Sequence, residues 1–284
     1  MEYQLQYNVC AALLCAIMLT THLMRKKTKE THNIIFTILI FITMVGALVN
    51  IANTTGNMNP GLMDETLLIL LDYLYFLLLN LPPFIFALYA IVLVKNSISS
   101  IPVRTKLLLF IPELILFGIL LSNPFTSAVF KYNDGVYARG NLQIILYIIS
   151  LYYTAFGAVY VLKEKAHTNW AMKFYISIFL IISYLTALIQ LLNPEMLLQH
   201  MGMALSELVI LLNLQKSGDY LNSELDVYNR RVLEKIVRMN LGAKKKMQIL
   251  VLHIEDLNFI LHNFGVENRT WKTENGFWYR LQNF

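Results

Sequence analysis

Seven stretches of this sequence are each apolar and long enough to cross a membrane as a helix. They cover residues 7–24, 34–54, 66–94, 107–122, 142–162, 174–192 and 196–215. About 20 apolar residues in a helix span the hydrocarbon core of a bilayer, so each stretch predicts one membrane-spanning helix. Charged residues make up only 14% of the chain, whereas soluble domains contain about a quarter. We therefore expect an all-α polytopic membrane bundle of seven transmembrane helices within the lipid bilayer.

Basic residues are concentrated in alternate loops. Ten of them follow the first, third and fifth apolar stretches, whereas the opposite loops contain only Lys131 and Arg139. Because basic loops stay in the cytoplasm, this asymmetry predicts an N-terminus outside and a C-terminus inside a cell inner (plasma) membrane. The net charge of +5 follows from this topology. Nucleic acid is therefore not expected as a partner.

Prolines and cysteines add local expectations. Pro82-Pro83 should kink the long third stretch, which neighbouring helices make tolerable in a membrane. The last two stretches are separated only by Asn193-Pro194-Glu195, which predicts a tight turn. Cys10 and Cys15 both fall within the first stretch and lack the spacing of metal ligands, so we interpret them as packing residues.

The longest loop on the predicted outer side covers residues 123–141 and combines turn-forming residues with aromatic ones. One interpretation is a hairpin whose Tyr132 and Tyr137 lie at the membrane interface, where amphipathic rings are enriched. The other interpretation is a lid over an outward-facing ligand cavity. Both interpretations remain open from the sequence.

Three carboxylates fall within the apolar stretches: Asp72, Glu113 and Glu207. Ionisable groups at membrane depth are costly, so they are candidates for an intramembrane ligand or proton site. They could equally serve as hydrogen-bonding groups that hold helices together. Uncharged side chains that could join them are Asn50, Asn80, Gln190, His200 and Asn213.

The chain becomes polar after residue 215. Residues 216–240 have apolar positions three and four apart, which predicts a signalling helix that continues inward from the last span. Residues 247–254 form a short apolar run typical of a buried strand, and residues 255–264 predict a second helix that ends before Gly265. The aromatic tail that follows shows no clear period.

Residues 222–265 resemble the start of a GGDEF domain, the diguanylate cyclase family. The matching residues are Asn229-Arg230-Arg231 on the first helix, the strand that ends near Glu255, and Gly265. The membrane part is similar to the seven-helix sensor modules that bacteria place before such domains. The resemblance implies a short α/β fragment, a homodimer through residues 217–240, and signal transduction in response to an unidentified small ligand.

Departures from the family pattern argue against cyclase activity. His253 occupies the position of the acid that binds Mg²⁺, and Leu261 occupies the position of the asparagine that reads guanine. The Gly-Gly-Asp/Glu-Glu-Phe hairpin is absent from the sequence. Phosphoryl transfer depends on positioning and charge neutralisation, so we expect no catalytic residue and no metal site. Mg²⁺ and GTP would be cofactors only of an intact domain.

The sequence thus predicts a membrane sensor with a catalytically incompetent GGDEF-like fragment. Its expected parts are a seven-helix sensor region at 1–215, the signalling helix at 216–240, and the truncated fragment with its aromatic tail at 241–284. Two alternatives remain open. The chain could be a fragment of a membrane-bound diguanylate cyclase that makes cyclic di-GMP from GTP, or it could be a small-solute transporter.

Overall fold

The computed structural model describes residues 3–24, 31–59, 61–95, 97–133, 136–164, 168 and 170–215, and also residues 237, 270–272 and 278–280. The chain divides into two compact units, Met1–Gln215 and Lys216–Phe284. The predicted signalling helix at 216–240, the GGDEF-like strand and second helix, and the motif residues Asn229, Arg230, Arg231, Glu255 and Gly265 lie outside the described residues.

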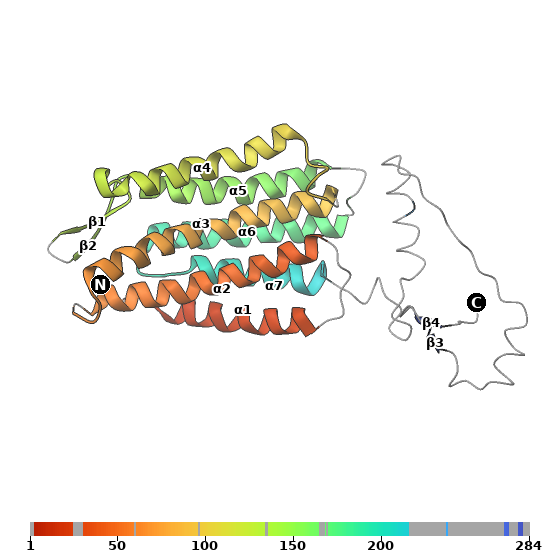
Figure 1. Ribbon diagram of the computed structural model, residues 1–284, viewed down its shortest axis with the longest axis horizontal. Helices are drawn as coiled ribbons and strands as arrows, with labels where there is room; N and C mark the ends of the chain where they lie inside the picture. The colour runs from red at the N-terminus through yellow and green to blue at the C-terminus, as the bar shows by residue number, and fades with distance from the viewer. Residues whose placement is uncertain are drawn as a thin grey trace, which may run out of the picture. The chain divides into compact units, whose positions relative to one another are not determined.

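The first unit is a helical bundle (Figure 1). Its helices are α1 (Gln6–Met24), α2 (Thr31–Met58), α3 (Glu65–Lys95), α4 (Val103–Thr126), α5 (Gln143–Lys163), α6 (Trp170–Leu192) and α7 (Gln199–Asn213). Among the described residues, α1 to α6 are six helices long and apolar enough to cross a membrane. This confirms a polytopic membrane protein and six of the predicted spans.

The seventh helix is shorter than its predicted span of 196–215. The described part of α7 has 15 residues, which extend only about 22 Å at 1.5 Å per residue, less than the ~30 Å of a bilayer core. Residues 193–198 form the connection instead, where the Met196 amide donates to the Asn193 carbonyl at 3.0 Å. The predicted tight turn is therefore present, and the seventh transmembrane span stays a prediction.

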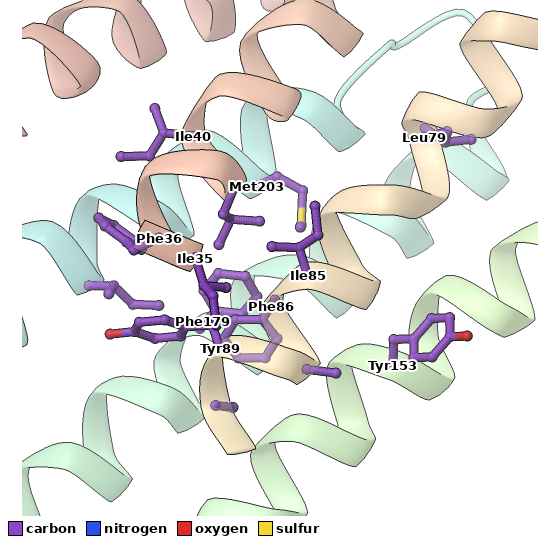
Figure 2. Close-up of a cluster of buried hydrophobic side chains, with 14 of the residues drawn as sticks. Ile35, Phe36, Ile40, Leu79, Ile85, Phe86, Tyr89, Tyr153, Phe179 and Met203 are labelled. Carbon is purple, nitrogen blue, oxygen red and sulfur yellow. The ribbon is translucent and has the colours of Figure 1, made fainter. Parts of the chain in front are cut away.

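Helix α3 occupies the middle of the bundle and packs mainly against α2 and α5. It is apolar around most of its circumference, as expected of a helix surrounded by other helices, and it continues as one helix through Pro82 and Pro83. Its own aromatic side chains contact those of α2 and α6 (Figure 2). The rings of Phe86 and Phe179 stack with centroids 3.6 Å apart, and Tyr89 lies 5.5 Å from Phe36.

Two glycines allow helices to approach closely. A Cβ atom on Gly157 of α5 would lie 2.9 Å from the Cα of Ala87 in α3, and one on Gly202 of α7 would overlap the side chain of Thr186 in α6. Small residues at such crossings are typical of membrane helices, whose association depends on close van der Waals packing. These glycines fix the spacing of α5 and α7 against the rest of the bundle.

The loop between α4 and α5 forms an antiparallel hairpin of β1 (Phe130–Asn133) and β2 (Val136–Arg139), with Tyr132 opposite Tyr137. Asn123 at the end of α4 holds its base, because the Asn123 Oδ1 accepts from the Val129 amide at 2.7 Å and its Nδ2 donates to the Phe130 carbonyl at 3.1 Å. We call this end of the bundle the hairpin end. The predicted loop 123–141 thus contains a hairpin, whereas its first four residues belong to α4.

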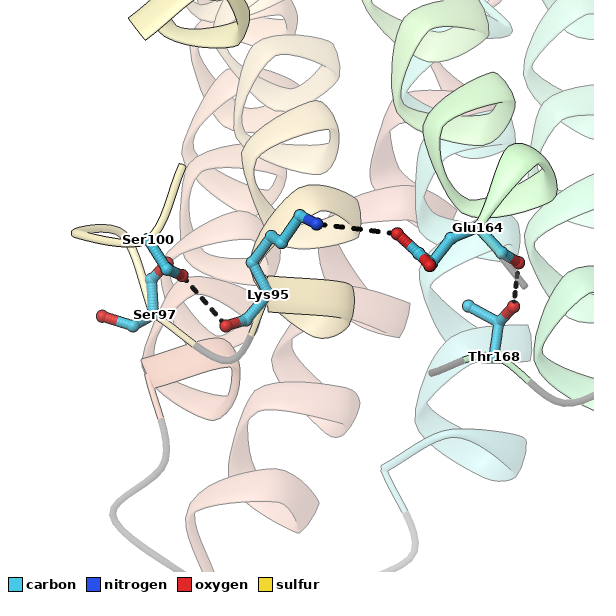
Figure 3. A network of polar contacts seen from close by, with 5 residues as sticks. All are labelled: Lys95, Ser97, Ser100, Glu164 and Thr168. Carbon is cyan, nitrogen blue, oxygen red and sulfur yellow. Dashed lines mark hydrogen bonds and ion pairs between the residues drawn. The ribbon is translucent and has the colours of Figure 1, made fainter. Parts of the chain in front are cut away.

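The opposite end carries basic residues and is called here the Lys95 end. The Lys95 Nζ lies 3.6 Å from the Glu164 Oε2, which connects the last turn of α3 to the residue after α5 (Figure 3). Ser100 donates to the Lys95 carbonyl at 3.0 Å and shapes the short α3–α4 loop. Lys106, Lys163 and Lys173 belong to helix segments near this same end.

In the second unit, β3 (Thr270–Lys272) pairs with β4 (Trp278–Arg280) in an antiparallel hairpin that places Trp271 opposite Tyr279. The tail without a clear sequence period therefore contains paired strands. Backbone pairing needs no regular pattern of apolar residues when only three residues on each side take part.

Candidate ligand-binding site

A cavity of about 400 Å³ opens at the hairpin end of the bundle. Its lining comes from α2, α3, α5 and α6, from strand β2, from residues 193–198 and from the N-terminus. Helix α2 contributes one polar face, made of Asn50, Asn53, Thr54 and Asn57. These side chains recur at three- and four-residue steps and therefore share one side of the helix. The other polar residues include Asp72, Tyr75, Arg139, Gln143, Tyr147 and Gln190.

Asp72 is buried at the cavity wall, with 1% of its surface exposed. Asn53 Nδ2 donates to its Oδ1 at 2.7 Å, and the Tyr132 hydroxyl donates to its Oδ2 at 2.6 Å. Asn57 Nδ2 donates in turn to Asn53 Oδ1 at 3.0 Å, which orients the Asn53 amide with its NH₂ toward Asp72. Both carboxylate oxygens thus accept hydrogen bonds, the arrangement that suits an ionised carboxyl group.

Tyr132 attaches the β-hairpin to the helices. Besides donating to Asp72, its hydroxyl lies 3.0 Å from Asn57 Oδ1 on α2. Burial, together with the Asp72 carboxylate, raises the pKa of Tyr132 well above its usual range, so the hydroxyl remains a donor. Phe130 packs beside it against Tyr73 and Phe76 of α3, with ring centroids 5.1 Å and 5.7 Å away. The hairpin is therefore held over the helix ends through its side chains.

Three lining groups have no hydrogen-bond or ion-pair partner among the described residues. Asn50 Nδ2 and Gln143 Oε1 are buried without a hydrogen bond to any described residue. Arg139 of β2 also lines the cavity; its side chain is exposed, and it forms no ion pair with the described part of the chain. Buried polar atoms are nearly always hydrogen-bonded in folded proteins, to protein or to water. Such unpartnered groups around a cavity are suited to hydrogen-bond with a ligand or with water.

Gln190 connects the cavity to α7. Its Oε1 accepts a hydrogen bond from the backbone amide of Gln199, the first residue of α7, at 2.7 Å. The first amides of a helix have no partner inside the helix, so this side chain satisfies one of them. Gln199 Nε2 also lies 3.4 Å from Ser150 Oγ on α5. The start of α7 is therefore fixed by side chains from α5 and α6.

Glu207 lies away from the cavity, in the interior of the bundle, with none of its surface exposed. Thr43 of α2 donates to its Oε1 at 2.5 Å, and the Cys15 Sγ of α1 lies 4.0 Å from its Oε2. Glu207 thus connects α7 to α1 and α2.

Glu113 of α4 lies neither at the cavity nor beside Glu207. Its carboxylate oxygens are buried without a hydrogen bond of ordinary geometry to the described residues. The nearby Tyr153 hydroxyl donates to the Leu109 carbonyl at 2.8 Å. The three carboxylates singled out from the sequence therefore do not share one site, because only Asp72 lines the cavity.

Of the uncharged partners named from the sequence, Asn50 and Gln190 line the cavity. Asn80 and Asn213 instead donate to carbonyls of their own helices, those of Phe76 and Val209. Sequence reasoning missed Asn53, Asn57, Gln143 and the unpaired Arg139 as site residues. The three- and four-residue spacing of polar side chains on α2 was the signal that could have identified the first two.

No group of three or more histidine, cysteine, aspartate or glutamate side chains able to hold a metal ion occurs within the described ranges. The chain matches no protein-family model, no curated protein and no solved structure.

Proposed function

We propose that the protein is a membrane sensor whose cavity at the hairpin end binds a small polar ligand and passes the binding event to α7. One observation carries this proposal: Gln190 lines the cavity and its side chain also caps the first amide of α7. A ligand that engages or displaces Gln190 would alter the hydrogen bond that fixes the start of this helix. A ligand can shift an equilibrium only through such a differential contact.

The proposed orientation places the hairpin end outside an inner (plasma) membrane. It rests on the basic residues near the Lys95 end, since basic loops favour the cytoplasm. The cavity would then be reached from outside, and the hairpin, attached through Tyr132, would act as its lid. This is the second of the two interpretations of residues 123–141.

Helix α7 is suited to carry a change between the two ends. It packs on α1, α2 and α6, and its contacts are close at Gly202 and polar at Glu207. Where the chain leaves the bundle, Gln215 Nε2 donates to the Tyr89 hydroxyl of α3 at 3.1 Å. Interfaces of this kind switch between discrete packings more readily than they deform continuously.

The receiver in this proposal is the C-terminal unit. Its resemblance to the start of a GGDEF domain suggests signalling through paired chains, with residues 217–240 as the dimer contact. His253 at the metal-binding position makes cyclase chemistry unexpected. Disulfide crosslinking of single cysteines along residues 217–228 tests the pairing, and the absence of any dimer pattern would refute it.

The central experiment measures whether a ligand changes the accessibility of α7 at the Lys95 end. Cys10 and Cys15 are replaced by alanine, and one cysteine is introduced by Asn213→Cys, or by Ser97→Cys in the α3–α4 loop as a control. Compounds that raise the melting temperature of the purified protein are then added during maleimide labelling. We expect the labelling rate to change at position 213 and to stay constant at position 97.

A Gln190→Met variant tests the route. Methionine has a similar length but cannot accept the Gln199 amide hydrogen bond. Because Gln190 also lines the cavity, the compound is added at a concentration that saturates the variant. Under this condition the variant should lose the labelling change at position 213. An unaltered labelling change in Gln190→Met, or a bound compound that never affects position 213, would contradict the proposed sensor.

A further inference from the structure

Opposite charges line the cavity without neutralising each other. Asp72 on α3 and Arg139 on β2 both face it, yet they form no ion pair. The partners of Asp72 are the Asn53 amide and the Tyr132 hydroxyl, which donate hydrogen bonds but carry no positive charge. A buried carboxylate without a counter-charge is costly. The cavity therefore presents one buried negative group and one exposed positive group, and neither has a counter-charge among the described residues.

The unpartnered atoms in the cavity are of both hydrogen-bonding kinds. Asn50, which is 3% exposed, has a free donor in Nδ2, and Gln143, which is 7% exposed, has a free acceptor in Oε1. A ligand that satisfies both must itself contain an acceptor and a donor. The rings of Tyr75, Tyr137 and Tyr147 also line the cavity, and aromatic faces attract organic cations.

We infer that the ligand is a zwitterion of amino-acid size, with its carboxylate near Arg139 and its ammonium group near Asp72. A neutral sugar would leave both charges unpaired. A phosphate-bearing ligand would pair with Arg139 but would bring a second negative charge toward Asp72. The volume of about 400 Å³ is within the range of small-molecule sites. This inference rests on the proposed function, because it assigns a ligand class to the same cavity.

The test uses the full-length protein in lipid nanodiscs and a defined set of probes. These are the twenty free α-amino acids and glycine betaine, together with the methyl esters and N-acetyl derivatives of any that bind, and neutral monosaccharides. Binding is measured by isothermal titration calorimetry and by the melting temperature. We expect at least one amino acid or the betaine to bind. Loss of either charge from an amino acid that binds, as the ester or the N-acetyl derivative, should weaken its binding at least tenfold.

Variants locate the charges. Arg139→Gln should weaken binding of the zwitterion at least tenfold. It should also abolish the difference in affinity between the zwitterion and its methyl ester. Lys131→Gln is the matched control, because Lys131 is a basic residue on the same hairpin and is exposed like Arg139, but does not line the cavity. Asp72→Asn should abolish the difference in affinity between the free amino acid and its N-acetyl derivative. If Asp72→Asn fails to fold, the Arg139→Gln and Lys131→Gln comparison alone decides the inference.

Three outcomes would overturn the ligand class: no zwitterion binds, the ester binds as well as the free acid, or Lys131→Gln weakens binding as much as Arg139→Gln. The sensor itself is judged separately by labelling at position 213. If an uncharged monosaccharide binds and changes this labelling while no zwitterion does, the assigned ligand class is refuted and the proposed sensor function is supported. A zwitterion that binds without affecting position 213 supports the ligand class and refutes the sensor.

Discussion

Replacing Tyr132 with phenylalanine should loosen the β-hairpin from the helices. The change removes the hydroxyl that donates at 2.6 Å to Asp72 and retains the ring that packs near Phe130 and Tyr137. A hydrogen bond to a charged group contributes roughly 1.5–3 kcal/mol. Tyr132 is only half-buried, so water partly replaces the lost donor, and we expect a loss of about 2 kcal/mol in the free energy of unfolding.

The thermal shift follows from the size of the bundle. For a unit as long as Met1–Gln215, each 1 kcal/mol lowers the melting temperature by about 2–4 °C. Tyr132→Phe should therefore lower it by roughly 4–8 °C, measured by differential scanning fluorimetry in detergent. Hydrogen exchange should show faster exchange at the amides of β1 and β2 than in the wild type.

Tyr137→Phe is the matched control for this prediction. Tyr137 faces Tyr132 across the hairpin and makes ring contacts but no hydrogen bond among the described residues. Its variant should change the melting temperature by less than half as much. A double-mutant cycle of Tyr132→Phe with Asp72→Asn should give a coupling energy of about 1 kcal/mol or more. Equal effects of the two tyrosine variants, or a coupling energy near zero, would refute the assigned role of the Tyr132–Asp72 contact.

Three further predictions concern the bundle. Gly202→Ala should lower the free energy of unfolding by about 1–3 kcal/mol, because the added methyl group meets α6. Gly118→Ala is the control and should change the melting temperature little, because nothing lies within 4 Å of a Cβ atom there. Similar melting temperatures for the two variants would contradict the close approach of α7. Lys95→Gln should cost less than about 1 kcal/mol in a chemical unfolding titration, because its ion pair with Glu164 is partly exposed, and a larger loss would show that this pair has another role. Glu207→Gln should retain the hydrogen bond from α2 and most of the stability, whereas Glu207→Ala should lower the free energy of unfolding by about 2 kcal/mol or more. Loss of solute uptake in proteoliposomes on Glu207→Gln would instead favour the transporter alternative.

Much of the membrane architecture could be predicted from the sequence. The predicted spans at 34–54 and 142–162 coincide closely with α2 (Thr31–Met58) and α5 (Gln143–Lys163). Length and hydropathy suffice for this, because a helix is the only single segment that satisfies its own backbone hydrogen bonds inside a bilayer. The same reasoning extended the seventh span to 196–215, but residues 196–198 belong to the connection from α6 and the described helix begins at Gln199.

The candidate site was only partly accessible to such reasoning. Asp72 was identified because a carboxylate in an apolar stretch stands out, and so were Glu113 and Glu207, which the structure places elsewhere. In the sequence, Arg139 is one of two basic residues in the loops on the predicted outer side, and Gln143 has no distinguishing pattern around it. Neither stands out in the sequence, because a polar residue in a loop or at a helix end is ordinary.

The sequence by itself determined the membrane class, six of the seven predicted long apolar helices, and the end of the bundle at which basic residues collect, because each depends on composition along a single segment. Only the tertiary structure decided which polar groups meet. The rotation of α2 about its axis turns Asn50 and Asn53 toward the cavity that Asp72 of α3 also lines, and the fold of β1 and β2 brings Tyr132 to Asp72 and Arg139 to the cavity. These arrangements depend on packing between segments far apart in the chain, and hydrophobic periodicity is weak where helices are apolar on most sides.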